Sequence, residues 1–142
     1  MLFRSLLDKW KNDSKVKLYN NAVWDKVDKI KIYILTEWSD ASTLYLEKND
    51  RKIDKNIFSE IESIDLSDFI KNNFTQEDYI ILKLDIEGAE WEVVNDLIET
   101  NQLSKINELY VEWHDRFFSH DFDSLRQKLK KYPNLIYKNW EF

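Results

Sequence analysis

The sequence predicts an α/β fold in which helices pack on both faces of a mostly parallel sheet. Segments that alternate like strands are followed by segments with helical spacing, in the order strand, helix, strand, helix. Residues 79–84 form a nearly continuous apolar run, which is typical of a central parallel strand covered on both faces. The next segment, residues 89–100, carries an apolar stripe at helical spacing.

The other elements follow from the same two periodicities. An amphipathic helix is predicted over residues 2–10 and is expected to pack on a sheet. The polar stretch from residue 37 to 56 is predicted to be the longest loop. Further helices are predicted at residues 67–73 and 122–132, the second ended by Pro133 and Asn134, and further strands at residues 16–20, 29–35, 61–66, 108–113 and 135–142.

Composition limits the classes of protein that fit. The chain has 142 residues, of which 43% are hydrophobic, so one domain over residues 1–142 is expected. The absence of cysteine excludes a disulfide framework, a thiol nucleophile and a Cys-ligated metal site. A net charge of -6 argues against a nucleic-acid partner. With a single glycine, Gly88, the chain holds no glycine-rich nucleotide loop.

No segment indicates a membrane partner. The N-terminal apolar residues are interrupted by Asp8, Lys9 and Lys11, so they do not form the apolar core of a signal peptide. No stretch approaches the roughly 20 apolar residues of a membrane span. A cytoplasmic protein is therefore expected.

Three carboxylates surround the glycine at the end of the best strand. Ligands bind beyond the carboxyl ends of strands in open α/β sheets, and Asp85 and Glu87 lie at such an end. If the strand stays extended, the two side chains share a face and converge on one cation or hydroxyl group. Glu90 begins near the buried side of the following helix. Helix capping by Asp85 or Glu87 is the alternative interpretation.

A second polar cluster follows the next predicted strand. Neighbouring parallel strands would bring Glu112 and His114 to the same sheet edge as Asp85. A histidine near a carboxylate suits a general base that takes a proton from a hydroxyl. The alternative is a surface histidine in a polar turn, and the second histidine, His120, is predicted to lie at the surface.

Four segments in order resemble one protein family. Lys83-Leu84-Asp85-Ile86-Glu87-Gly88-Ala89-Glu90 resembles the K-x-D-[IV]-E-G-A-E hallmark of the FkbM family of S-adenosylmethionine-dependent methyltransferases. Supporting matches are Asn21-Ala22-Val23-Trp24-Asp25, Ser63-Ile64-Asp65-Leu66-Ser67-Asp68-Phe69 and Leu109-Tyr110-Val111-Glu112-Trp113-His114. The resemblance implies a Rossmann-like class I methyltransferase sheet and methyl transfer, usually to a hydroxyl oxygen of a sugar or small metabolite.

The resemblance also implies roles for particular residues. Ala22 and Val23 would border the adenine of S-adenosylmethionine, and Asp25 would contact its amino group. Asp85 would lie beside both the methyl donor and the acceptor, and His114 would be the base. Glu87, Glu90 and Glu112 would shape or polarise the acceptor pocket, with Glu87 counted beside Asp85 and His114 among the catalytic residues.

The chain departs from the family pattern at its start. Complete members begin with a strand, a glycine-rich loop and a second strand that ends in a ribose-binding acid, and this chain resembles the part that follows. We therefore expect a truncated domain whose exposed sheet edge pairs with a second copy or with a completing partner chain. The alternative is a non-catalytic remnant that acts as a binding or assembly module. A metal-dependent nuclease is disfavoured, because Ala89 stands where a lysine would follow the glutamate.

Overall fold

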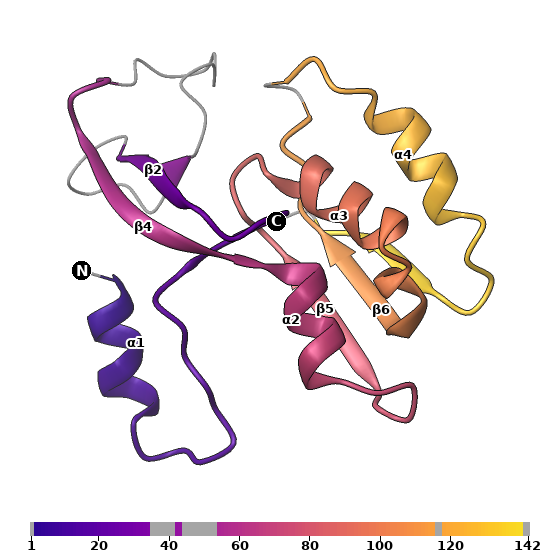
Figure 1. Ribbon diagram of the computed structural model, residues 1–142, viewed down its shortest axis with the longest axis horizontal. Coiled ribbons are helices and arrows are strands. Elements are labelled where there is room, and N and C mark those ends of the chain that lie inside the picture. Colours follow the sequence, from indigo (N-terminus) through magenta and orange to yellow (C-terminus); the bar gives the residue numbers. More distant parts are fainter. Residues whose placement is uncertain (1, 35–41, 44–53, 116–117, 141–142) are drawn as a thin grey trace.

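The computed structural model describes residues 2–34, 42–43, 54–115 and 118–140, which form two sheets and their covering helices (Figure 1). The elements in chain order are α1 (Leu2–Trp10), β1 (Ala22–Trp24), β2 (Lys29–Ile34), β3 (Ser42–Thr43), β4 (Phe58–Asp65), α2 (Leu66–Asn73), β5 (Ile80–Leu84), α3 (Glu90–Glu99), the 3-10 helix η1 (Gln102–Lys105), β6 (Ile106–Val111), α4 (Phe122–Leu129) and β7 (Ile136–Asn139).

The first sheet is mixed and has the strand order β1-β4-β2-β3. The last three residues of β4 run parallel to β1, whereas its earlier residues run antiparallel to β2. Ser63 lies at this junction, where its hydroxyl donates to the carbonyl of Lys26 at 2.7 Å and accepts from the amide of Asp28 at 2.9 Å. This buried hydroxyl therefore joins the turn between β1 and β2 to the long strand β4.

The second sheet is parallel and has the order β5-β6-β7. Leu84 of β5 is in register with Val111 of β6, which is in register with Asn139 of β7. Alternate residues of β5 and β6 join α2, α3 and α4 in one hydrophobic core, in which Leu84, Leu97, Leu109 and Leu125 are at most 2% exposed. The carboxyl ends of β5 and β6 therefore lie side by side.

The opposite face of this sheet is open to solvent, which contradicts part of the prediction. Residues 79–84 were expected to be a central strand covered on both faces, but β5 is the edge strand of the described sheet. Ile81, Glu108 and Ile136 are in register on the outer face, with Ile81 60% exposed and Ile136 47% exposed. The apolar run reflects one buried face and one face that no described helix covers.

The α/β class is confirmed, and so are most predicted elements. The mostly parallel arrangement holds for β5, β6 and β7, whereas the first sheet is mixed. Residues 16–20 were wrongly predicted as a strand: they are coil, and the nearby strand is Ala22–Trp24, which is the segment in register with Ser63–Asp65 of β4. The predicted loop 37–56 lies mostly outside the described residues, and Ser42–Thr43 within it forms β3.

The N-terminal helix forms as predicted, but its apolar side is not buried against a sheet. Leu6 and Leu7 of α1 are 41% and 42% exposed, and Trp10 is 37% exposed. Figure 1 shows α1 beside the first sheet, joined to β1 by a long connection. The amphipathic spacing predicted the helix correctly, whereas its expected burial against a sheet was wrong for the described chain. None of the described helices combines the length and apolar character that crossing a bilayer requires.

Candidate functional site

The site begins where β5 ends and the chain turns into α3. Glu87 has a φ of 59° and Gly88 a φ of 125°, so the backbone enters the left-handed region directly after Ile86. Glycine reaches such angles without steric cost, whereas a residue with a Cβ atom does so at a cost. Asp85 and Glu87 therefore do not continue an extended strand, and the turn itself brings their side chains together.

Glu90 holds this turn from inside the protein. Its side chain has no exposed surface, and Oε1 accepts hydrogen bonds from the backbone amides of Ile86 at 3.0 Å and Gly88 at 3.3 Å. The residue that caps α3 is Ala89, which makes no side-chain cap hydrogen bond. The turn therefore depends on a carboxylate within the helix, and neither Asp85 nor Glu87 is the N-cap residue.

His114 reaches the same place from the neighbouring strand. The amide of Glu112 donates to the carbonyl of Leu84 at 3.0 Å, which extends the β5–β6 ladder one step beyond the strands. His114, two residues further, is buried and 7% exposed. Its Nδ1 lies 3.0 Å from Oε1 of Glu90. Because Oε1 already accepts two amide protons, the proton of this contact belongs to Nδ1.

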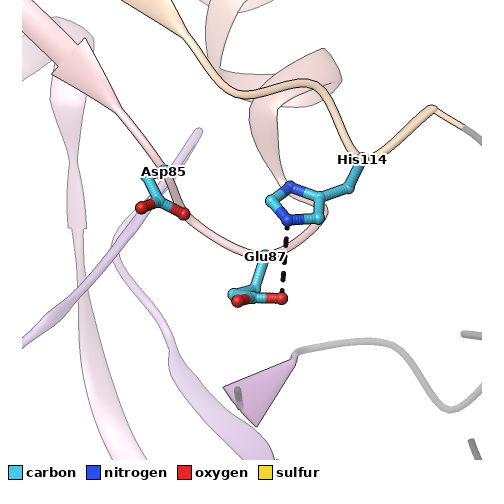
Figure 2. A group of neighbouring side chains, drawn as sticks. All are labelled: Asp85, Glu87 and His114. Atoms are coloured by element: carbon cyan, nitrogen blue, oxygen red, sulfur yellow. Dashed lines mark ion pairs between the residues drawn. The ribbon is translucent and has the colours of Figure 1, made fainter. Parts of the chain in front are cut away.

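Figure 2 shows the three side chains that converge: Asp85 from the end of β5, Glu87 from the turn, and His114 from the segment after β6. Nε2 of His114 lies 3.5 Å from Oε2 of Glu87. One donor atom from each of the three residues lies within 4.8 Å of the others, a spacing that suits a shared cation. We call these residues the Asp85–Glu87–His114 cluster.

Two residues outside the predicted site support the cluster. The Thr43 hydroxyl on β3 donates to the backbone carbonyl of Glu87 at 3.0 Å, and Thr43 is 1% exposed. Lys83 lies 3.8 Å from Asp85 and also packs over the ring of Trp140 at 4.3 Å. Thr43 comes from a segment predicted as loop and lies 44 residues before Glu87, so no local pattern indicated it.

The predicted adenine segment lies on the other sheet. Ala22 and Val23 are half-buried in β1, and Oδ1 of Asp25, which directly follows β1, is buried without a hydrogen-bond partner in the described chain. Nε1 of Trp24 is buried and unpaired in the same way. An unpaired acceptor on Asp25 is compatible with the predicted contact to an exocyclic amino group, and the adenine site itself stays a prediction.

Asp96 of α3 lies near this segment. Burial raises the pKa of the Asp96 carboxyl, and the charges of Asp65 and Asp25 raise it further, while a hydrogen bond from Ser67 opposes them. The raised pKa indicates that carboxylates crowd together where β1, β4 and α3 meet.

His120 lies at the surface, as predicted, with 34% of its side chain exposed. Its ring stacks on Trp91 with 4.6 Å between ring centroids, and Nε2 lies 3.2 Å from Glu92. It also lines an open pocket of about 260 Å³ whose other lining residues are Asp115, Asp121, Phe122, Asp123 and Arg126. One of the lining residues, Asp115, directly follows His114 of the Asp85–Glu87–His114 cluster in the chain.

Comparison with known proteins assigns the chain to a family. Residues 7–136 match the methyltransferase FkbM domain, which covers most of the 142-residue chain. The protein therefore belongs to the FkbM methyltransferase family, as the octet around Gly88 predicted. Searches among curated proteins and among solved structures found no match.

The structure brings some of the predicted site residues together and leaves others apart. Asp85, Glu87 and His114 form one cluster, with Glu90 directly behind His114. Glu112 lies at the same sheet edge, where its backbone amide donates to the carbonyl of Leu84. Ala22, Val23 and Asp25 belong to the other sheet. The roles of all these residues remain predictions.

Proposed function

We propose that the protein transfers a methyl group from S-adenosylmethionine to a hydroxyl oxygen of a sugar or small metabolite. Family membership supports methyl transfer as the reaction class. The observation that carries the proposal is the convergence of Asp85, Glu87 and His114 at the carboxyl ends of β5 and β6. In sheets of this kind, that is where ligands bind.

The methyl donor supplies an electrophilic methyl group, and the protein must align the acceptor oxygen and receive its proton. Nδ1 of His114 donates to Glu90, so in the neutral ring Nε2 carries the lone pair and faces the cluster. Nε2 is thus the atom that accepts the hydroxyl proton. The carboxylate of Glu87 then stabilises the resulting imidazolium across 3.5 Å.

Other residues would position the two substrates. We propose that Ala22, Val23 and Asp25 hold the adenine and that Asp85 orients the acceptor hydroxyl. Glu90 acts through His114 as a positioning residue, because it is fully buried. The pocket beside Asp115 and His120 offers carboxylates and an aromatic ring, groups that suit the hydroxyls and the apolar face of a sugar.

Calorimetric titration with S-adenosylhomocysteine tests the donor half of this proposal. We expect micromolar binding that Asp25→Ala and Asp85→Ala each weaken by about tenfold or more, because each removes a polar contact worth about 1–3 kcal/mol. The matched control is Glu77→Gln, since Glu77 is exposed and precedes the opposite end of β5. The proposal fails if a folded chain shows no binding.

Transfer of a radiolabelled methyl group to a panel of sugars and hydroxylated metabolites tests the acceptor half. We expect His114→Gln to lower the transfer rate by about 10²–10⁴-fold while donor binding persists, because it removes the base. Equal rates in the wild type and His114→Gln would exclude His114 as the base. Circular dichroism checks that this buried substitution leaves the fold intact.

One observation favours a second candidate, a non-catalytic module that docks on a partner. The outer face of β5, β6 and β7 exposes Ile81 and Ile136, and β5 is an edge strand among the residues that the structure describes. Such an edge can pair with a second copy or with a completing chain. Self-association of a folded chain that binds no methyl donor would favour this candidate over methyl transfer.

A further inference from the structure

The geometry around His114 leaves one contact in need of explanation. Nδ1 donates its proton to Glu90, so in the neutral imidazole Nε2 has only a lone pair to offer. Facing it at 3.5 Å is Oε2 of Glu87, which is also an acceptor. Two acceptors that face each other repel unless a proton or a cation lies between them.

The distance favours a cation. A hydrogen bond from a protonated histidine to a carboxylate would be about 2.7–2.9 Å long, shorter than the observed contact. Two ligands that each lie about 2.1 Å from a tetrahedral metal ion are about 3.4 Å apart. The 3.5 Å between Nε2 and Oε2 matches this second arrangement.

The buried carboxylate of Glu90 behind the cluster also favours a cation. Asp85, Glu87 and Glu90 place three carboxyl groups around one imidazole, and Lys83 lies 3.8 Å from Asp85. Glu90 has no exposed surface, and its Oε2 has no hydrogen-bond partner in the described chain. A buried carboxylate with one oxygen lacking a hydrogen bond is stabilised by a nearby cation.

The contact behind His114 also has the form found in metal sites. A metal-bound histidine almost always donates its other ring N–H to a carboxylate or carbonyl, which fixes the tautomer and the ring orientation. Glu90 does this for His114 and is itself fixed by two backbone amides. The Asp85 and Glu87 side chains are 36% and 27% exposed, so one side of the cluster is open to water or to a bound hydroxyl.

We propose that Asp85, Glu87 and Nε2 of His114 bind a divalent transition-metal ion. A set of two carboxylates and one imidazole suits manganese or zinc, whereas magnesium and calcium prefer oxygen ligands alone. The site stands whether or not the chain transfers methyl groups. If it does, the ion held by these three residues would act as a Lewis acid on an acceptor hydroxyl at the open side of the cluster, and water on that side would take the hydroxyl proton, because Nε2 of His114 would then be a ligand and not the base.

Metal titration without any methyl donor tests this proposal. After treatment with a chelator, the chain is titrated with MnCl₂, followed by the electron paramagnetic resonance signal of free Mn²⁺, and with ZnCl₂ by calorimetry. We expect one saturable site. Asp85→Asn and Glu87→Gln should each weaken binding tenfold or more, and Glu90→Gln, which replaces the carboxylate that accepts the Nδ1 proton of His114, should weaken it by about 10- to 100-fold.

Two control variants make the test specific. Glu77→Gln removes a carboxylate at the far end of β5 and should leave the affinity unchanged. His120→Ala removes the other of the two histidines, which pairs with Glu92, and should also leave it unchanged. The proposal is overturned if neither ion binds in a saturable way, if Asp85→Asn and Glu87→Gln bind like the wild type, or if His120→Ala abolishes binding.

Discussion

At the residue scale, the site is organised by two residues that face the protein interior. Glu90 fixes the turn by accepting two backbone amides and fixes the His114 ring through Nδ1. Thr43 holds the carbonyl of Glu87 from the other sheet. The side chains that face solvent, Asp85 and Glu87, thus owe their positions to groups that a substrate cannot reach.

Glu87 combines an unfavourable backbone angle with a site carboxylate, which gives a prediction about stability. Its φ of 59° costs a non-glycine residue roughly 1–2 kcal/mol, partly offset because glycine is more flexible when unfolded. We expect Glu87→Gly to raise the free energy of unfolding by about 0.5–1 kcal/mol in urea titrations, while it abolishes the metal binding proposed above.

Asn101 is the matched control for this substitution. It has a φ of 60°, and asparagine tolerates the left-handed region, so Asn101→Gly should leave stability almost unchanged. A Glu87→Gly variant less stable than the wild type would show that the carboxylate supports the fold and that the backbone angle is not a net cost.

The convergence of Asp85, Glu87 and His114 could be predicted from the sequence, because adjacent parallel strands bring their carboxyl ends together. The geometry of that convergence could not, because it depends on the left-handed turn at Glu87 and Gly88. The spacing predicts Glu90 as an acid near the buried side of α3. It does not predict its hydrogen bonds, because these link two backbone amides to the ring of His114, which is 24 residues away. Thr43 gave no signal, since its role arises only from the packing of the two sheets.

At the scale of elements, α3 links the two sheets and concentrates acidic groups. Its buried residues Val93, Val94 and Leu97 belong to the central core, while Asp96 lies near Asp25 and Asp65 at the ends of β1 and β4. Ser67 at the start of α2 donates a hydrogen bond to Asp96. The helix therefore carries a charged carboxylate into a region already rich in negative charge.

This arrangement predicts a pH dependence. Because burial raises the pKa of Asp96 above its ordinary value of 3.8, the folded chain holds this proton where the unfolded chain has released it. Asp96 therefore makes stability fall as pH rises through the window from 3.8 to the raised pKa, and the loss persists at higher pH. We expect Asp96→Asn to have a higher Tm than the wild type at pH 7 and no advantage below pH about 3.

Ser67→Ala is the complementary variant. Removing the hydroxyl that stabilises the charged carboxylate should raise the pKa of Asp96 further and deepen the loss of stability at neutral pH. Thermal melts across pH 3 to 8 would measure both variants. A Tm for Asp96→Asn that falls with pH as steeply as the wild type's would contradict this account.

The elements themselves were largely predictable, because α2, α3, α4 and the three parallel strands follow clear periodicities. The environment of β5 was not. An apolar run such as Ile80-Ile81-Leu82 is the same whether a strand is covered on one face or on two, and only the arrangement of elements decides between them. The wrong prediction of a strand at residues 16–20 has a similar cause. Pairing with β4 decides which segment becomes the strand, and the segment that pairs is Ala22–Trp24.

At the scale of the whole molecule, two apolar surfaces remain uncovered in the described chain. One is the outer face of the parallel sheet, with Ile81 and Ile136, and the other is the apolar side of α1, with Leu6 and Leu7. Figure 1 shows that α1 lies apart from β5 and α3, so the two apolar surfaces are separate. A partner that covers the sheet would bury mainly the first surface.

We therefore expect the chain to self-associate through the outer face and edge of β5. Ile81→Lys places a charge in that face and should shift the mass measured by light scattering toward the monomer at high concentration. Val27→Lys is the control, because Val27 is 76% exposed in the turn before β2. A wild-type chain that stays monomeric at high concentration would refute this expectation.

The enclosed contact between Glu90 and His114 has a consequence for spectroscopy. The Nδ1 proton lies between a ring that is 7% exposed and a carboxylate with no exposed surface, so we expect it to exchange slowly with water. A proton shared with a carboxylate in this way resonates far downfield of the amide region. We therefore expect the position of this proton's nuclear magnetic resonance signal to change when a ligand binds the opposite nitrogen of the ring.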